Sequence, residues 1–378
     1  MAYIGKSLST GAGGYIGTGL DRAIRTRPNF VINGSCQINQ RGNSTGVTNA
    51  GSGYHGPDRY KFNEDGTMTA IVSIERETLT SGNAYNDGHL YAYKLSVTTA
   101  DTAVAADIYT RITHRFEKDN LATLSKGSSS AKAVTLSFWV KATVTGTNVV
   151  EFFDQVNSRQ VGATYAISSS NTWEYKKVTF PADTSGALGS GNGLAAEINF
   201  VLQAGSDYTS GTLDTSWASE TAANRAAGHN SNHFSSTSNT FHFTGVQLEI
   251  GDLATAFEHE DIGTTLRKCQ RYFTKSWSQG SAVTTNAGVI GAACVGNANR
   301  AFGNVFWPVT MRSAPTVTWY SGSTGTANKW RNASQGTDIT AASPIAAIGQ
   351  SGYGFVLSSG IVGITDTLQG HYQAEAEL

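Results

Sequence analysis

The chain has 378 residues, too many for one ordinary compact core, so we expect two main folding units with appendages. Its 27 Lys and Arg residues nearly balance its 28 Asp and Glu residues, and the resulting net charge of −1 disfavours nucleic acid and anionic bilayers as partners. Three widely separated cysteines fit neither a disulfide framework nor a zinc cluster, and no apolar run approaches the ~20 residues of a membrane helix.

Residues 1–28 are rich in Gly, Ser and Thr and have little periodic apolar content. Such a segment cannot bury enough apolar surface to fold alone. We therefore expect an extended arm that a partner orders.

From Phe30 onward, apolar and polar residues alternate with the period of two that is typical of half-buried strands. The pattern is clearest in residues 91–97, 108–116, 134–141, 194–203 and 241–250. Within 134–141 the aliphatic side chains face one side while Trp139 and Lys141 face the other, which predicts a sandwich strand with one dry and one wet face. The alternation slips at Gly245, where we expect a β-bulge. The Ser-, Thr-, Asn- and Gly-rich stretch 204–240 is predicted to be a long loop between two sandwich strands.

One stretch has helical spacing, with Leu266, Cys269 and Phe273 on one face behind a Thr cap. We predict a linking helix within 261–276. It separates a first β-rich region, 29–260, from a second, 277–378.

The second region contains further short strands but few residues from which to build a core of its own. The strands are expected around 289–295, 305–309, 316–320, 354–357 and 371–374. A small β domain could complete its core by pairing with copies of itself. Glu375 and Glu377 alternate along the last predicted strand, so we expect both on one solvated side.

Several motifs together resemble a known family. They are Asn29–Gly42 with Pro57–Tyr60, Leu136–Ala142, Trp173–Tyr175, Thr244–Gly251 with Ala256–Glu258, Cys269–Phe273, Trp307–Val317 and Ala374–Leu378. In order and spacing they resemble bacteriophage tail fibre and receptor-binding structural proteins, over roughly residues 29–378. One departure is Asn39, where the family usually carries an aromatic residue.

The resemblance implies an all-β protein with a jelly-roll β-sandwich similar to carbohydrate-binding modules (29–260), the linking helix (261–276) and a small C-terminal β domain that trimerises (277–378). Residues 1–28 lie outside the resemblance, and from their position we expect them to form an N-terminal virion-attachment arm. The resemblance also implies a location in the phage tail, and we expect a structural protein rather than an enzyme. The arm would dock to other virion proteins through Tyr3, Ile4, Tyr15, Ile16, Arg22 and Arg25.

In this interpretation the β domains contact host cell-surface polysaccharide, and three copies multiply weak sugar contacts. Aromatic faces beside amide and hydroxyl groups usually hold sugars. The candidates are Trp217, Trp319, Tyr320, Trp330 and Tyr353. Trp217 is expected to face solvent, whereas the other four could instead be buried in the trimer core.

Two other roles stay open. A head or tail decoration protein would cement the particle and bind no cell. A polysaccharide depolymerase would show a long β-helix with paired acids, and the irregular strand spacing and lack of a repeat count against it.

Other chemistry-bearing patterns are expected to be structural, so we predict no catalytic residue, no metal site and no cofactor. His229 and His233 have helical ligand spacing but lie in a Gly- and Asn-rich loop. Gly51–Gly56 has the form G-x-G-x-x-G, yet Pro57 follows where a helix should open. Glu258, Glu260 and Asp261 precede the helix, whose dipole favours acids there. A structural calcium stays an open possibility. Arg59 is expected to pair with a nearby acid.

Overall fold

The computed structural model describes residues 9–10, 14–15, 29–48, 51–279, 281, 283–284, 288–294, 301–340, 343–344, 348–357 and 366–378. From the predicted arm, β1 (Ser9–Thr10) and β2 (Gly14–Tyr15) pair in an antiparallel manner. Tyr3, Ile4, Ile16, Arg22 and Arg25 lie outside the described residues, as does the side chain of Tyr15.

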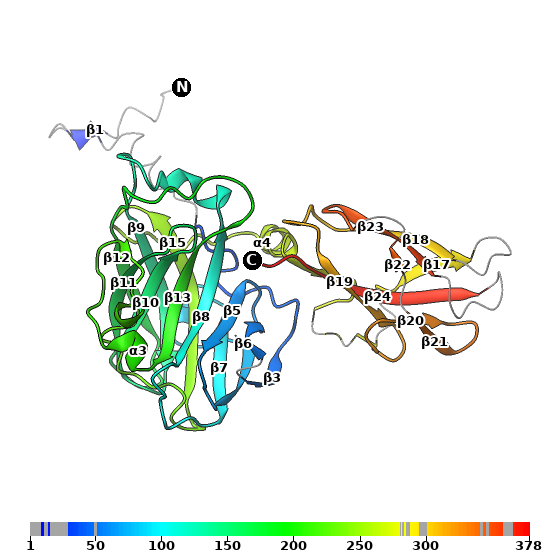
Figure 1. Ribbon diagram of the computed structural model, residues 1–378, viewed down its shortest axis with the longest axis horizontal. Coiled ribbons are helices and arrows are strands. Elements are labelled where there is room, and N and C mark those ends of the chain that lie inside the picture. The colour runs from blue at the N-terminus through cyan, green and yellow to red at the C-terminus, as the bar shows by residue number, and fades with distance from the viewer. Residues whose placement is uncertain are drawn as a thin grey trace.

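The first large unit consists of two antiparallel sheets packed face to face (Figure 1). One sheet runs β14 (Ala218–Ser219), β11 (Arg159–Ile167), β10 (Gly146–Asp154), β13 (Leu194–Ala204), β8 (Tyr109–Glu117), β5 (Tyr60–Asp65) and β4 (Gly53–Tyr54). The other runs β12 (Glu174–Phe180), β9 (Val134–Ala142), β15 (Thr240–Ile250), β7 (Tyr91–Thr99), β6 (Ile71–Thr78) and β3 (Ser44–Val47). The predicted all-β sandwich is confirmed.

The core between the sheets follows from the alternation along the strands. Leu136, Phe138 and Val140 of β9 point inward and are fully buried. Phe138 packs edge-to-face on Phe200 of β13, with ring centroids 5.0 Å apart. The odd-numbered side chains of β9 are consequently left on the outer face of its sheet.

Glycine at position 245 forms the bulge that the slipped alternation predicted. The register between β15 and β9 shifts between Thr244 and Gln247, and Gly245 has φ of 61°. This backbone region is open to glycine at little cost.

Short helices lie in the connections. They are α2 (Asn83–Asn86), η3 (Asp119–Leu124), α3 (Ser206–Thr209) and η4 (Ala222–Asn224). The predicted loop 204–240 thus carries α3, β14 and η4 between irregular segments. None of the described helices has the length and apolarity to span a bilayer.

The linking helix is α4 (Ile262–Gln270), and both of its ends differ from the prediction. Its N-cap is Asp261, whose Oδ1 accepts a hydrogen bond from the Thr264 amide at 3.1 Å. It stops before Phe273 because Phe273–Lys275 forms strand β16, which pairs with β24. The predicted boundaries at 260 and 276 themselves stay predictions.

A further antiparallel sheet follows the helix (Figure 1). Its order is β21 (Thr337–Thr340), β20 (Lys329–Asn332), β24 (Thr367–Glu375), β17 (Ile290–Cys294), β18 (Ala301–Phe306), β23 (Gly352–Leu357) and β22 (Ser343–Pro344). Strands β16 and β19 (Thr316–Ser321) also pair with β24. The strand expected at 305–309 lies instead at Ala301–Phe306, because Trp307 and Pro308 follow its end.

This C-terminal β domain has a hydrophobic core within a single chain. Trp319, Trp330, Phe355 and Leu368 are buried against one another, with the Trp319 and Trp330 ring centroids 4.9 Å apart. The expectation that this region has too few residues for a core of its own is therefore wrong, whereas its pairing with copies of itself stays a prediction. Large aromatic rings fill the volume that the many glycines leave empty.

A buried arginine joins the two units. The Arg59 guanidinium is fully buried, forms an ion pair with Glu377 and stacks on the Tyr272 ring 3.4 Å from its centroid. The predicted pairing of Arg59 with an acid is confirmed, but the solvated position expected for Glu377 is wrong. Residues 375–378 turn back toward the sandwich, where the Arg41 guanidinium also reaches Glu377 at 3.2 Å.

Replacing Arg59 by Met should strongly destabilise this junction, because the substitution leaves the Glu377 carboxylate buried without its main partner. We expect a loss of about 3 kcal/mol or more in the free energy of unfolding. Arg331→Met is the matched control, since the Arg331–Asp338 pair is longer and more exposed, and should cost at most about 1 kcal/mol. Denaturant titration of each variant measures both values, and equal losses would contradict the role of Arg59.

Candidate functional site

The aromatic residues singled out in the C-terminal β domain are mostly core residues. Trp319, Trp330 and Tyr353 are buried in contact with Phe355. Tyr320 is half-buried with its ring edge against Trp277. The structure therefore differs from the expectation of an exposed sugar platform here, because these rings supply the core of a glycine-rich domain.

Trp217 also differs from its expected solvent-facing position. It packs on the sandwich core, its indole nitrogen donates a hydrogen bond to the Pro181 carbonyl at 2.9 Å, and the Lys126 ammonium lies 4.7 Å from its ring centroid. Both the ring and its polar atom are therefore already engaged.

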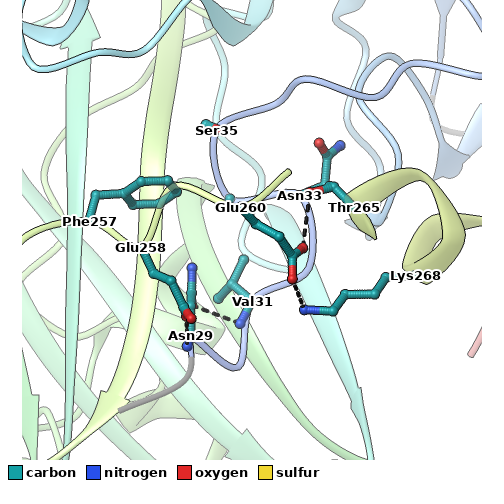
Figure 2. A pocket seen from close by; sticks show the side chains of 10 residues that line it. Asn29, Val31, Asn33, Ser35, Phe257, Glu258, Glu260, Thr265 and Lys268 are labelled. Carbon is teal, nitrogen blue, oxygen red and sulfur yellow. Dashed lines mark hydrogen bonds and ion pairs between the residues drawn. The ribbon is translucent and has the colours of Figure 1, made fainter. Parts of the chain in front are cut away.

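The three acidic residues before α4 have structural roles, and Figure 2 shows two of them, Glu258 and Glu260. The Asn29 amide donates to Glu258 at 2.7 Å, the Thr265 hydroxyl donates to Glu260 at 3.0 Å, and Asp261 caps the helix. The cavity that Glu258 and Glu260 help to line has a volume of only about 30 Å³. It is therefore too small for anything larger than water.

The two histidines of the loop do not form a metal centre with other ligands. Nε2 of His233 contacts Oδ1 of Asn148 at 2.8 Å, and burial lowers the His233 pKa to about 3. No group of three or more His, Cys, Asp or Glu residues with ligand geometry occurs in the described part of the chain.

A groove on the outer face of the β12–β3 sheet offers a better candidate site. Its volume is about 350 Å³, within the range typical of ligand sites. Ser137, Trp139 and Gly245 from β9 and β15 line it, together with residues of two loops. The loop residues are Asp87 and His89 after α2, and Thr255, Ala256 and Phe257 after β15.

An aromatic pair stands at this groove. Tyr175 of β12 lies opposite Trp139 of β9 in register, with ring centroids 5.3 Å apart and planes at 53°. Tyr175 is 43% exposed although large. The indole nitrogen of Trp139 donates to Oδ2 of Asp87 at 2.9 Å, so the loop holds the Trp ring in place.

The bulge at Gly245 makes room for the inner wall. A Cβ at this position would lie 2.5 Å from Nε2 of His89 and 3.2 Å from the Trp139 ring. Glycine therefore permits the loop after α2 to approach the sheet.

His89 brings an unused polar group to the groove. Its ring is almost completely buried, and neither ring nitrogen makes a hydrogen bond within the described residues. The Asp87 carboxylate lies 3.8 Å away. Burial, with a smaller contribution from nearby His259, lowers the His89 pKa to about 4, so the ring is neutral near pH 7. A neutral imidazole can both donate and accept a hydrogen bond.

Sequence reasoning found parts of this groove without joining them. Alternation placed Trp139 on the wet face and a bulge at Gly245, and Trp173–Tyr175 was recognised as a motif. Phe257 lies within the motif Ala256–Glu258, but the contributions of Asp87 and His89 had no sequence signal, because loops far apart in the chain meet only after the sheet has formed.

No family model and no curated protein matches the chain. Among solved structures, it is similar to the enzymatically active domain of tailspike protein 4 of bacteriophage CBA120, at 15% identity and a TM-score of 0.30 over 59% of the chain. The chain spans only 21% of that structure. A family 11 carbohydrate-binding module of a Clostridium thermocellum cellulase is 13% identical, with 54% of this chain and 94% of that one covered and a TM-score of 0.27. A xylan-binding domain from Paenibacillus barcinonensis is 14% identical, with a TM-score of 0.26, and the match covers 51% of this chain and 92% of that domain. Likeness at this level transfers no ligand to this chain.

Gly245→Ala should close the groove and destabilise the sandwich. Alanine is strained at the positive φ of this position, and its methyl group would also collide with His89. We therefore expect a loss of about 2 kcal/mol or more in the free energy of unfolding. Gly46→Ala is the control, because Gly46 has φ of 67° but open space around it, and it should cost about 1 kcal/mol. Denaturant titrations compare the two variants, and equal costs would show that the space at Gly245 is not needed.

Proposed function

We propose that this protein is a non-enzymatic structural component of a phage tail that holds a host-surface glycan in the groove between Trp139, Tyr175 and the His89 loop. The observation that carries the proposal is the partly exposed Trp139–Tyr175 pair beside polar groups that can bond hydroxyls. Sugars present apolar ring faces, which pack on aromatic rings, and many hydroxyls, which form hydrogen bonds with polar side chains.

The polar lining supports binding rather than cleavage. Asp87 is the one carboxylate among the residues lining the groove, and it already accepts the Trp139 hydrogen bond. Hydrolysis of a glycosidic bond generally needs two acids on opposite sides of the bond. Binding without hydrolysis is accordingly the activity that we assign.

The phage location rests on the family resemblance of residues 29–378. In this proposal the arm 1–28 docks to other virion proteins, while the sandwich and the C-terminal β domain project toward the host. Weak binding by each groove would become strong through several linked copies.

An exposed apolar patch supports self-association of the C-terminal β domain. Phe302 and Phe306 of β18 are 43% and 79% exposed, and Val356 of β23 lies opposite Phe302. Large apolar side chains gathered on one sheet face are typical of an interface. We propose that further copies of this chain cover the patch in a trimer.

Removing the Tyr175 ring should weaken glycan binding. The test measures retention of the purified full chain on an array of bacterial capsular and O-antigen polysaccharides, followed by calorimetry with the best-retained glycan. Tyr175→Ala should lower the affinity about tenfold, because it removes an aromatic contact face. Val156→Ala, at a 38% exposed position outside the groove, should leave the affinity unchanged.

The same assay separates the rival roles. Absence of retention by the unmodified protein would favour a decoration protein, and release of new reducing ends would favour a depolymerase. Equal affinities for Tyr175→Ala and the unmodified chain would remove the groove as the binding site.

Changing Phe306 to Ser should weaken the proposed trimer, because it removes the most exposed ring of the patch. Sedimentation equilibrium should give three times the chain mass for the unmodified protein and for Val104→Ser, a control at a 41% exposed apolar position in the sandwich. Phe306→Ser should shift the equilibrium toward the single chain. A well-folded single chain before any substitution would contradict the trimer.

A further inference from the structure

A second and larger cleft lies at the junction of the sandwich and the C-terminal β domain. Its volume is about 520 Å³. Arg41 and Arg76 line it from the sandwich, and Lys275 and Trp277 line it from the segment that begins with β16. The cleft shares no residue with the groove around Trp139.

The three cations of the cleft differ in how they are compensated. Arg41 forms ion pairs with Glu375 and Glu377, both at 3.2 Å. Arg76 donates to the Gln37 carbonyl at 2.6 Å and stacks on Tyr91, and within the described residues it forms no ion pair with a carboxylate. Arg76 is therefore a candidate to bind an external anion, and Lys275, which also forms no ion pair with a described carboxylate, is a second candidate.

Lys275 is the least compensated of the three. Its ammonium lies 4.7 Å from the Trp277 ring centroid and is not within ion-pair distance of any described carboxylate. Burial lowers the Lys275 pKa to about 8, with only a partial opposing effect of Asp58. A bound anion would offset the cost of keeping this ammonium charged in a half-buried place.

Amide groups complete the lining. The Asn39 side chain donates to Asn43 at 3.0 Å, while its own Oδ1 is buried and has no hydrogen-bond partner among the described residues. Gln279 accepts from the Asn39 backbone amide at 3.3 Å. The cleft therefore presents fixed neutral polar groups beside its cations, and one of these groups is unsatisfied.

We propose that this cleft binds a carboxylate-bearing sugar unit, with the carboxylate held between Lys275 and Arg76 and the hydroxyls facing the amides and Trp277. Cations beside a carboxylate make strong, short hydrogen bonds, and amides pair with hydroxyls in both directions. The inference relies on the proposed function only in taking the ligand to be a saccharide. It adds that the ligand is acidic and that it binds at a site separate from the aromatic groove.

The test compares an acidic sugar with its neutral counterpart. Calorimetry on the full chain uses a galacturonic acid trimer and the methyl ester of the same trimer. We expect the unmodified protein to prefer the acid by about tenfold. Lys275→Met and Arg76→Gln should each abolish most of this preference, whereas Lys132→Met, at an exposed lysine outside the cleft, should keep it.

Several results would overturn the inference. They are equal binding of acid and ester by the unmodified chain, and an unchanged preference in both cleft variants with unaltered melting temperatures. Inorganic phosphate is included as a competitor. Complete displacement of the acid trimer by an equal concentration of phosphate would show an anion site with no specificity for a sugar. Tyr175→Ala separates the two sites, because failure of the aromatic groove leaves the acid-over-ester preference in place.

Discussion

The burial of Arg59 against Glu377 and Tyr272 is the constraint on which the arrangement of this protein depends. The guanidinium comes from the sandwich, the ring follows the linking helix, and the carboxylate follows the final strand. A buried cation needs a partner, so these three segments must meet. Arg41 and Arg115 extend the contact to Glu375 and to the Leu378 carbonyl.

Neighbouring contacts make the junction broader than one ion pair. Arg271 binds Glu117 through two hydrogen bonds of 2.8 Å, and the Tyr272 hydroxyl donates to the same carboxylate. Burial alone would raise the Glu117 pKa, but these hydrogen bonds lower it below its usual range. The carboxylate stays charged, and the segment after α4 is held on the sandwich.

The molecule has two different concave surfaces, one within the sandwich and one at the junction. The aromatic groove belongs to the sandwich alone and depends on the bulge at Gly245. The cationic cleft exists only where the two units meet, since Arg76 and Lys275 come from opposite sides of it. In the function proposed above, a host glycan with both neutral and acidic sugars would contact both surfaces, and repeated copies of the chain would multiply the effect.

The sequence by itself determined the local structure. Alternation in 134–141 and 241–250 predicted strands and their buried faces, and the interruption of the alternation at Gly245 predicted the bulge, because each of these signals lies within a few residues. The arginine at position 59 likewise predicted an acidic partner. Only the tertiary structure decided that the partner is Glu377, 318 residues away, that Trp319 and Trp330 fill a core within one chain, and that Asp87, His89 and Tyr175 share a groove. Those pairings depend on the order of strands in the sheets, and short-range patterns of polarity carry no information on which distant segments become neighbours.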